Sequence, residues 1–188
     1  MRIHVFGASG SGTTTFGRAL ASRFFVPHHD TDEYYWEPTE IPFSKKRPIA
    51  SRLDLMESMF LGRSNWVLSG SLVSWSATIT PYFELAIFLT LDNTERLKRI
   101  QQREVIRCGE DALAPGGSRY TAYQNFMAWN SGYETSAFNG RSRKLHEDWM
   151  KTLSCPVIRL DSRSGTSDLV KETEFKLSKI FNEENRRS

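Results

Sequence analysis

Cysteine is scarce in this sequence. Its 188 residues include only Cys108 and Cys155, which lie far apart and do not form a metal-ligand spacing. Two cysteines cannot provide the disulfide framework of a small secreted domain, and a chain of this length can bury a sufficient core without one. We therefore expect two free thiols in a reducing compartment, which favours the cytoplasm.

Long apolar runs are also missing. The longest such stretch, residues 85–91, is much shorter than the roughly 20 residues that a membrane-spanning helix needs. The N-terminus leads directly into a strand-like run and lacks the charged start, apolar stretch and cleavage site of a signal peptide. The net charge of +3 is too small to indicate nucleic-acid binding on its own. We expect neither membrane association nor a nucleic-acid partner.

Apolar periodicity divides the chain into alternating strands and helices. Short β-branched or apolar runs predict strands at residues 2–6, 25–28, 65–69, 85–91 and 156–160. Helical spacing predicts helices at residues 12–24, 49–61, 94–107, 120–133, 140–153 and 167–181. Prolines and glycines indicate irregular segments at residues 36–48 and 108–118. The alternation predicts one α/β domain over residues 1–188, with a parallel sheet of about five strands covered by helices on both faces.

A glycine-rich turn, GASGSGTT at residues 7–14, joins the first predicted strand to the first helix. It follows the P-loop pattern G-x-x-x-x-G-K-[ST] at both glycines, Gly7 and Gly12, and at the magnesium-binding hydroxyl, Thr14. The lysine of that pattern is missing, because Thr13 stands in its place. The ammonium group that would bridge the outer phosphates is therefore absent from the turn.

The rest of the turn retains the chemistry of a phosphate site. Glycines allow the backbone to turn tightly and to approach phosphate oxygens, and successive N–H groups then form a concave anion nest. The helix that follows contributes the positive end of its dipole. We predict that ATP binds here, through residues Gly7, Ala8, Ser9, Gly10, Ser11, Gly12, Thr13 and Thr14.

Two aspartates, Asp30 and Asp32, follow the second predicted strand at the carboxyl edge of the sheet, where α/β proteins bind ligands. Carboxylates, waters and phosphates are the ligands that Mg²⁺ prefers. We predict that Thr14, Asp30 and Asp32 bind Mg²⁺, with the aspartates also serving catalysis. The alternative is an exposed acidic turn.

Arginines recur along the helix predicted at residues 94–107. Arg99, Arg103 and Arg107 stand four residues apart, so they share one helix face, and Arg96 lies near it. A guanidinium binds phosphate oxygens in pairs, so we predict that these three arginines close over the nucleotide during catalysis. The alternative is a basic surface stripe paired with neighbouring glutamates. If the covering segment is longer, the candidates are Arg119, Arg141 and Arg143.

The first forty residues resemble the adenylate kinase-like P-loop proteins, and among them the small kinases called DNA topology modulation protein. The resemblance lies in IHVFGASGSGTTTFGRALA at residues 3–21, the Asp-x-Asp of residues 30–32, and the pair Tyr35-Trp36. It implies a nucleoside-monophosphate-kinase fold with an acceptor-binding region at about residues 30–75 and a lid-like helical insertion at about 103–143. Ser69-Gly70-Ser71 falls where related kinases carry Asp-Gly.

The resemblance implies an ATP- and Mg²⁺-dependent phosphotransferase with a nucleotide or another small-molecule acceptor. We expect the acceptor near Asp30, in contact with Tyr35, Trp36 and Gly70. A second hypothesis is a regulatory nucleotide-binding protein whose turnover is weakened by the missing lysine. A third is a transferase with another phosphate-bearing donor, because residues 11–14 resemble the phosphosulfate loop of sulfotransferases.

Overall fold

A single parallel sheet organises the chain, which a computed structural model describes for residues 1–75, 77–135 and 137–185. In that part of the chain, five strands pair in the order β2-β3-β1-β4-β5. Their bounds are β1 (Arg2–Gly7), β2 (His28–Asp30), β3 (Trp66–Ser69), β4 (Leu85–Thr90) and β5 (Val157–Asp161). The strand pairs are parallel throughout, which confirms the predicted α/β fold with a sheet of about five strands.

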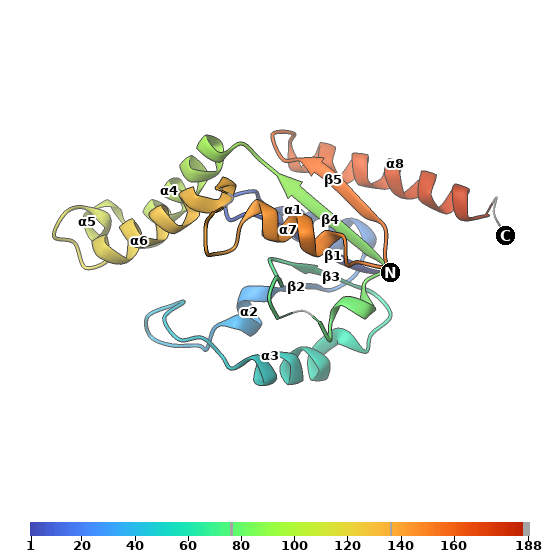
Figure 1. The fold of residues 1–188 in the computed structure, drawn as a ribbon, viewed down its shortest axis with the longest axis horizontal. Helices are drawn as coiled ribbons and strands as arrows, with labels where there is room; N and C mark the ends of the chain where they lie inside the picture. The colour runs from blue at the N-terminus through green and yellow to red at the C-terminus, as the bar shows by residue number, and fades with distance from the viewer. Residues whose placement is uncertain (76, 136, 186–188) are drawn as a thin grey trace.

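Helices fill the connections between the strands (Figure 1). The α-helices are α1 (Thr13–Phe24), α2 (Thr31–Tyr35), α3 (Ile49–Met56), α4 (Asn93–Cys108), α5 (Glu110–Leu113), α6 (Tyr120–Ser131), α7 (Arg143–Met150) and α8 (Thr166–Asn185). A π-helical turn, η1 (Glu57–Leu61), continues α3, and 3₁₀ turns occur at η2 (Thr80–Tyr82) and η3 (Gly132–Glu134). Each predicted helix is present, and α5 adds a short helix within the predicted loop at residues 108–118.

The core lies on both faces of the sheet because side chains alternate along each strand. On β1, Ile3 and Val5 pack with α1 and α8, whereas Phe6 packs toward α7 on the opposite face. Tyr34 of α2 and Phe60 of η1 belong to a further cluster around β3. The burial of β4 on both faces accounts for its continuous apolar sequence.

The second strand starts later than predicted. Residues 25–28 were expected as a strand, but Phe25 ends α1 in a left-handed conformation with φ +53° and is 93% exposed. Its N–H donates to the carbonyls of Ala21 and Ser22, which satisfies the end of the helix. The strand therefore spans His28–Asp30, and this shift places Asp30 at the carboxyl end of β2.

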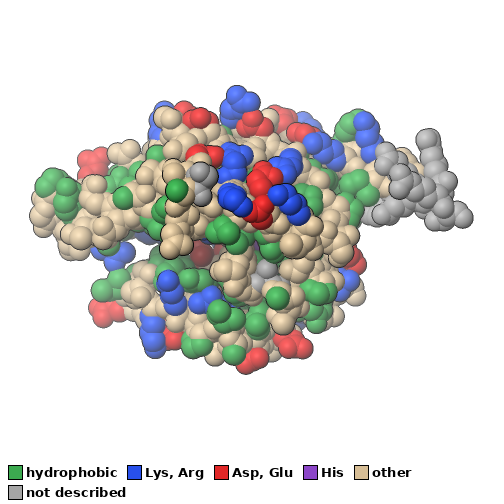
Figure 2. All heavy atoms as spheres, viewed as in Figure 1, with side chains coloured by type: hydrophobic (Ala, Val, Ile, Leu, Met, Phe, Trp, Pro, Cys, Tyr) green, Lys and Arg blue, Asp and Glu red, His purple; other side chains and the backbone are tan. Residues whose placement is uncertain are grey.

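Two walls rise from the carboxyl edge of the sheet. One is the arm, defined here as α4, α5 and α6, and the other consists of α2, residues 36–48 and α3 (Figure 1). Figure 2 shows a hollow between these walls. At one point the walls touch, because the Arg107 guanidinium lies 4.8 Å from the centre of the Phe43 ring. Among the residues that the structure describes, no helix is long and apolar enough to cross a membrane.

Candidate phosphate-binding site

The loop after β1 forms a closed turn at the base of the hollow. Gly10 and Gly12 have φ angles of +81° and +89°, a left-handed conformation that side-chain-bearing residues rarely adopt. Ser11 donates from both its N–H and its hydroxyl to the Ala8 carbonyl, at 3.1 and 2.8 Å. Gly12 then starts α1 without a side-chain cap, so the first N–H groups of the helix remain open to an anion.

Close packing explains two of the glycines. A Cβ atom on Gly7 would lie 2.5 Å from the Leu89 carbonyl oxygen of β4. A Cβ atom on Gly10 would lie 2.5 Å from the Arg96 carbonyl oxygen of α4. The loop is therefore packed directly against the backbone of both neighbouring elements, and these contacts fix its position at the foot of the arm.

The threonine of the loop contacts the acidic segment that follows β2, while the predicted binding of Mg²⁺ by Thr14, Asp30 and Asp32 stays a prediction. Thr14 Oγ1 donates to Asp30 Oδ2 at 2.6 Å, and Asp30 is 8% exposed. The other oxygen, Asp30 Oδ1, accepts the N–H of Asp32 at 3.0 Å and so caps α2. Ser69 donates to Asp30 Oδ2 at 3.4 Å from the end of β3.

Thr14 and Asp30 provide only two oxygen ligands, a set that suits Mg²⁺ better than a metal ion whose ligands all come from the protein. Within the described residues, no group of three or more histidines, cysteines, aspartates or glutamates could hold a metal ion. Mg²⁺ is commonly bound by one or two carboxylates, with waters and substrate phosphates completing its octahedron. Thr14 and Asp30 are positioned to provide the protein ligands of such a site, directly beside the glycine-rich turn.

The Asp32 side chain is exposed at the protein surface, yet protein atoms on several sides partly desolvate its carboxylate, and charged groups lie nearby. Burial raises the pKa of Asp32 above its ordinary value, and the neighbouring charge of Asp30 raises it further. Arg141, the Trp36 side chain and Arg103 act in the opposite direction on this pKa. Asp32 is therefore a carboxylate at the start of α2 whose pKa responds to Asp30 of β2 and to arginines of the opposite side of the hollow.

Gly70 and its neighbours form the floor of the hollow at the end of β3. Gly70 has φ +107°, and a side chain there would collide with Thr31 at the start of α2. Its N–H donates to the Val5 carbonyl at 2.9 Å. The close approach of α2 thus explains the glycine, and the predicted contact of Gly70 with an acceptor stays a prediction.

The predicted aromatic pair lines the wall opposite the arm. Tyr35 lies 3.8 Å below the guanidinium of Arg52, and Trp36 packs edge-on against Phe43 at 6.0 Å. Arg52 is 6% exposed, and its Nε donates to the Arg47 carbonyl at 2.7 Å. Sequence reasoning missed Arg52, although its signal was visible: it stands four residues before Met56 on the apolar face of its helix.

The arginines of α4 have different surroundings. Arg96 is buried and donates to the carbonyls of Ser9 and Asn130 at 2.7 and 3.2 Å, so it ties the loop to the arm. Arg99 Nη1 lies 3.9 Å from the position of a Cβ on Gly12, and its Nη2 donates to the Ser162 carbonyl at 3.1 Å. Of the predicted helix face, Arg99 is thus the member beside the loop.

The other two arginines of that face share one carboxylate. Arg103 and Arg107 lie 3.1 and 3.3 Å from Glu104 Oε1. All three residues belong to the second half of α4. This matches the ion-paired stripe that was the alternative interpretation of the sequence. Whether Arg103 and Arg107 also serve catalysis stays a prediction.

Arg141, between η3 and α7, approaches the loop from the arm side. Its Nη2 donates to Ser9 Oγ at 2.6 Å, and its guanidinium lies 5.2 Å from the Trp129 ring centre. Its Nε is inaccessible to solvent and has no hydrogen-bond partner among the described residues. The contact joins residues 132 positions apart, so the sequence could give Arg141 only as one of several candidates.

A buried hydrogen-bonded chain holds the segment that carries Arg141. His146 of α7 lies 3.0 Å through Nε2 from the Ser71 hydroxyl and 2.7 Å through Nδ1 from the Tyr133 hydroxyl. Burial lowers the pKa of His146 to about 3, so the ring is neutral at physiological pH. These hydrogen bonds connect Ser71 after β3, Tyr133 of η3 and His146 of α7. Arg141 lies in the segment between η3 and α7.

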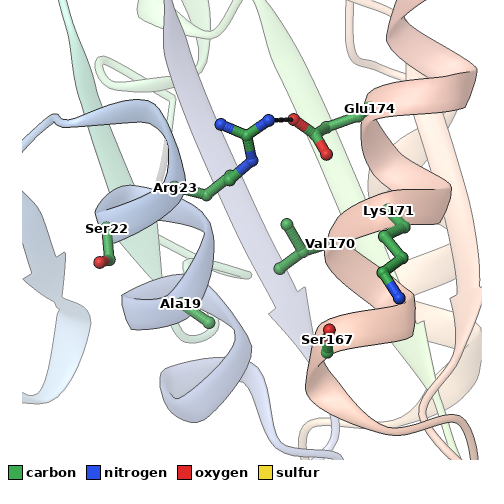
Figure 3. A pocket seen from close by; sticks show the side chains of 7 residues that line it. All are labelled: Ala19, Ser22, Arg23, Ser167, Val170, Lys171 and Glu174. Atoms are coloured by element: carbon green, nitrogen blue, oxygen red, sulfur yellow. Dashed lines mark ion pairs between the residues drawn. The ribbon is translucent and has the colours of Figure 1, made fainter.

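A separate groove lies between α1 and α8 (Figure 3). Ala19 and Arg23 of α1 face Val170 and Glu174 of α8 across it, and Arg23 pairs with Glu174 at 2.6 Å. These α1 residues belong to the second half of the helix, whereas the glycine loop precedes its first residue. The groove therefore does not contribute to the phosphate-binding site.

Comparison with known proteins establishes the relationship of the chain. It is 41% identical over 168 residues to "Uncharacterized protein YqaC" of Bacillus subtilis (strain 168), across 89% of this chain and 92% of that protein. The chain belongs to the YqaC family. No established family model matches the sequence.

Solved structures show which fold the YqaC family has. A gluconokinase from Sinorhizobium meliloti 1021 superposes with a TM-score of 0.56 at 16% identity, covering 100% of this chain and 97% of that one. A shikimate kinase from Aquifex aeolicus vf5 gives 0.56 at 18%, covering 96% and 98%. A shikimate kinase from Acinetobacter baumannii, in complex with shikimate, gives 0.54 at 15%, covering 95% and 93%. The chain has the P-loop fold of small kinases.

Proposed function

We propose that this protein is a magnesium-dependent phosphotransferase that moves the γ-phosphoryl group of ATP to a small-molecule acceptor, which is a nucleotide or another hydroxyl compound. The observation that carries the proposal is the 2.6 Å hydrogen bond from Thr14 to Asp30 beside an anion-binding turn. The kinase fold and the adenylate kinase-like sequence of the first forty residues support it.

In this proposal the backbone of residues 7–14 holds the phosphates, and Thr14 and Asp30 hold Mg²⁺. When bound, Mg²⁺ neutralises charge that develops on the phosphate oxygens. Asp32 accepts a hydrogen bond from the acceptor hydroxyl and orients it. Arg99 lies on the nucleotide side of the loop, and Arg103 and Arg107 belong to the proposed lid at about residues 103–143.

The transfer step follows from this arrangement. The acceptor oxygen forms a bond to the γ-phosphorus while the bond from that phosphorus to the bridging oxygen breaks, and the electron pair leaves with ADP. The proton of the acceptor hydroxyl passes to the Asp32 carboxylate. The protein contributes positioning and charge stabilisation rather than a covalent intermediate.

The acceptor occupies the hollow between the walls, in the proposed region of about residues 30–75. Tyr35, Trp36 and Gly70 border this space, as Arg52 does through its stacking on Tyr35. A single domain with a cytoplasmic location completes the proposal, consistent with the two free thiols, Cys108 and Cys155.

Thr13 favours one rival, a regulatory nucleotide-binding protein with little turnover. The experiment is transfer of labelled γ-phosphate from ATP to nucleoside monophosphates and small hydroxy acids, with and without Mg²⁺, beside a thermal-shift measurement with ATP. Transfer to any acceptor supports the kinase. ATP binding without transfer supports the regulatory protein, and absence of ATP stabilisation rejects both.

A further inference from the structure

A loop without its lysine needs another cation. The phosphates of a nucleoside triphosphate carry several negative charges, and the side chain at position 13 is neutral. Backbone N–H groups and a helix dipole bind an anion, but they do not bridge its outer oxygens as a side-chain cation does. Arg119 lies at the start of α6. The candidates nearer the loop are Arg96, Arg99, Arg103 and Arg107 of α4 and Arg141 before α7, and their contacts distinguish them.

Four of these arginines already have other partners. Arg96 uses both terminal nitrogens on protein oxygens, since Nη1 binds the Ser9 carbonyl and Nη2 binds Asn93 and Asn130. Arg103 and Arg107 are paired with Glu104, and Arg99 is directed to the Ser162 carbonyl. Arg96, Arg103 and Arg107 are therefore committed to protein oxygens, whereas Arg99 keeps Nη1 3.9 Å from the Cβ position of Gly12 and is a second candidate beside the loop.

Arg141 is the candidate that contacts a side chain of the loop. Its guanidinium binds the loop itself, at Ser9 Oγ, and forms no ion pair with any described carboxylate. Its Nε is buried without a partner. Arg141 is half-buried, and the negative charge of Asp32 partly compensates its own. A half-buried cation with an unused donor is stabilised further when an anion binds it. Trp129 packs on the guanidinium, and the anchoring of Tyr133 and Ser71 by His146 holds its backbone segment in place.

We propose that Arg141 supplies, from outside the loop, the positive charge that Thr13 lacks, and that its guanidinium binds the outer phosphate oxygens of the nucleotide. This inference rests on the proposed nucleotide binding, and it names a residue far from the loop in sequence. The planar fork of Arg141 binds two phosphate oxygens at once, with the Ser9 contact fixing its orientation.

The test is a charge-relocation cycle with Arg141→Met, Thr13→Lys and the double variant. Equilibrium dissociation constants for ATP and AMP with Mg²⁺ are measured by calorimetry. We expect Arg141→Met to weaken ATP binding roughly 10- to 100-fold, the range for a lost charged hydrogen bond, and AMP binding much less. Thr13→Lys added to Arg141→Met recovers most of the loss, because the new ammonium occupies the lysine position of the loop.

The matched control is Arg159→Met, which removes an exposed arginine of β5, outside the loop and the arm, that is paired with Glu147 at 2.6 and 2.5 Å. ATP binding by this control stays close to that of the parent protein. Thermal unfolding without ligand checks that each variant folds, and Arg141→Lys, which retains the charge, provides a second probe if Arg141→Met unfolds. An intermediate affinity of Arg141→Lys supports the inference.

Two results would overturn it while leaving the proposed function intact. One is ATP binding by a folded Arg141→Met protein that equals that of the parent. The other is a loss that Thr13→Lys does not recover and that Ser9→Ala reproduces, because Arg141 would then only brace the loop. Failure of the parent protein to bind ATP would instead reject the proposed function, and the inference with it.

Discussion

The loop at residues 7–14 and the arm that faces it are built on different principles. The loop takes its binding groups from eight consecutive residues, and its shape follows from glycines with left-handed backbones. The arm and the segment that follows it present side chains whose roles depend on tertiary contacts: Arg96 is structural, Arg103 is ion-paired, and Arg141, before α7, reaches the loop. A site built from backbone groups can be predicted from a short stretch of sequence, whereas a site built from side chains depends on how distant segments pack.

The largest effect that separates the two regions is expected at Gly10. Replacing Gly10 with valine introduces a β-branched residue at φ +81° and a Cβ that meets the Arg96 carbonyl. We expect roughly 2–4 kcal/mol of lost stability and no stabilisation by ATP. Thermal and urea unfolding with and without ATP measure both effects. The control is Gly62→Ala, since nothing lies within 4 Å of its Cβ position. A stable Gly10→Val protein that binds ATP would contradict the assigned loop geometry.

The next effect concerns the link between the loop and the acidic segment. Asp30→Asn removes the charge that faces Thr14 and also one proposed Mg²⁺ ligand. We expect the rate of phosphate transfer to fall about 10²- to 10³-fold, comparable with the removal of one transition-state-stabilising group. Transfer rates over a magnesium titration provide the measurement. Asp54→Asn, on the exposed side of α3, is the control. An unchanged rate for Asp30→Asn would remove Asp30 from the metal site.

A smaller effect compares the two regions through pH. His4 lies in β1, which precedes the loop, and His146 lies in α7, which follows Arg141. Burial lowers the pKa of each histidine to about 3. Both pKa values lie below the unfolded value near 6.5, so the unfolded chain binds more protons as the pH falls. Stability is therefore retained near neutral pH and lost as the pH falls from about 6.5 toward 3. At pH 5 the loss is roughly 2 kcal/mol for each histidine.

The contribution of one region can be removed separately. His4 stacks between Phe6 and Phe83 at 5.2 and 4.7 Å, so His4→Phe keeps a ring in this position, although it loses the contact of Nδ1 with the Leu68 carbonyl at 3.2 Å. Urea unfolding at pH 7.5 and pH 5 measures the effect. We expect this variant to lose the share of the decrease that belongs to His4, while His28, His29 and His146, whose pKa values burial also lowers, keep theirs. An unaltered pH dependence would mean that other groups cause it.

The smallest effect is expected on the outer face of the arm. Arg103→Gln breaks an exposed pair with Glu104, so stability changes by about 0.5 kcal/mol or less. ATP affinity, measured by the same calorimetry, changes much less than in Arg141→Met. A loss equal to that of Arg141→Met would restore the sequence-based assignment, in which the arginines of α4 close over the phosphates.

Sequence reasoning succeeded where local rules determine the structure. The order of strands and helices follows from apolar periodicity, and the meeting of Thr14 with Asp30 follows from the shared carboxyl edge of a parallel sheet. The start of β2 was placed too early because Phe25, an apolar residue, ends a helix in a left-handed conformation. Propensity alone gives no reason to expect phenylalanine there.

The arginines show where such reasoning stops. Helical spacing correctly placed Arg99, Arg103 and Arg107 on one helix, but it could not distinguish a buried tie such as Arg96 from a solvated pair. The approach of Arg141 to Ser9 depends on the packing of Tyr133, His146 and Ser71. Those contacts join segments from three parts of the chain, and no short-range pattern encodes them.

The buried Arg96 has a consequence for how the protein can change during evolution and turnover. Through Ser9 and Asn130 it fastens the nucleotide side of the hollow to the foot of the arm, and Gly10 packs on its backbone. The loop and the start of α4 are thus held together as one unit. Residues 36–48 contact the arm through the Phe43 ring, so under the proposed function we expect this segment to adjust to acceptors of different size.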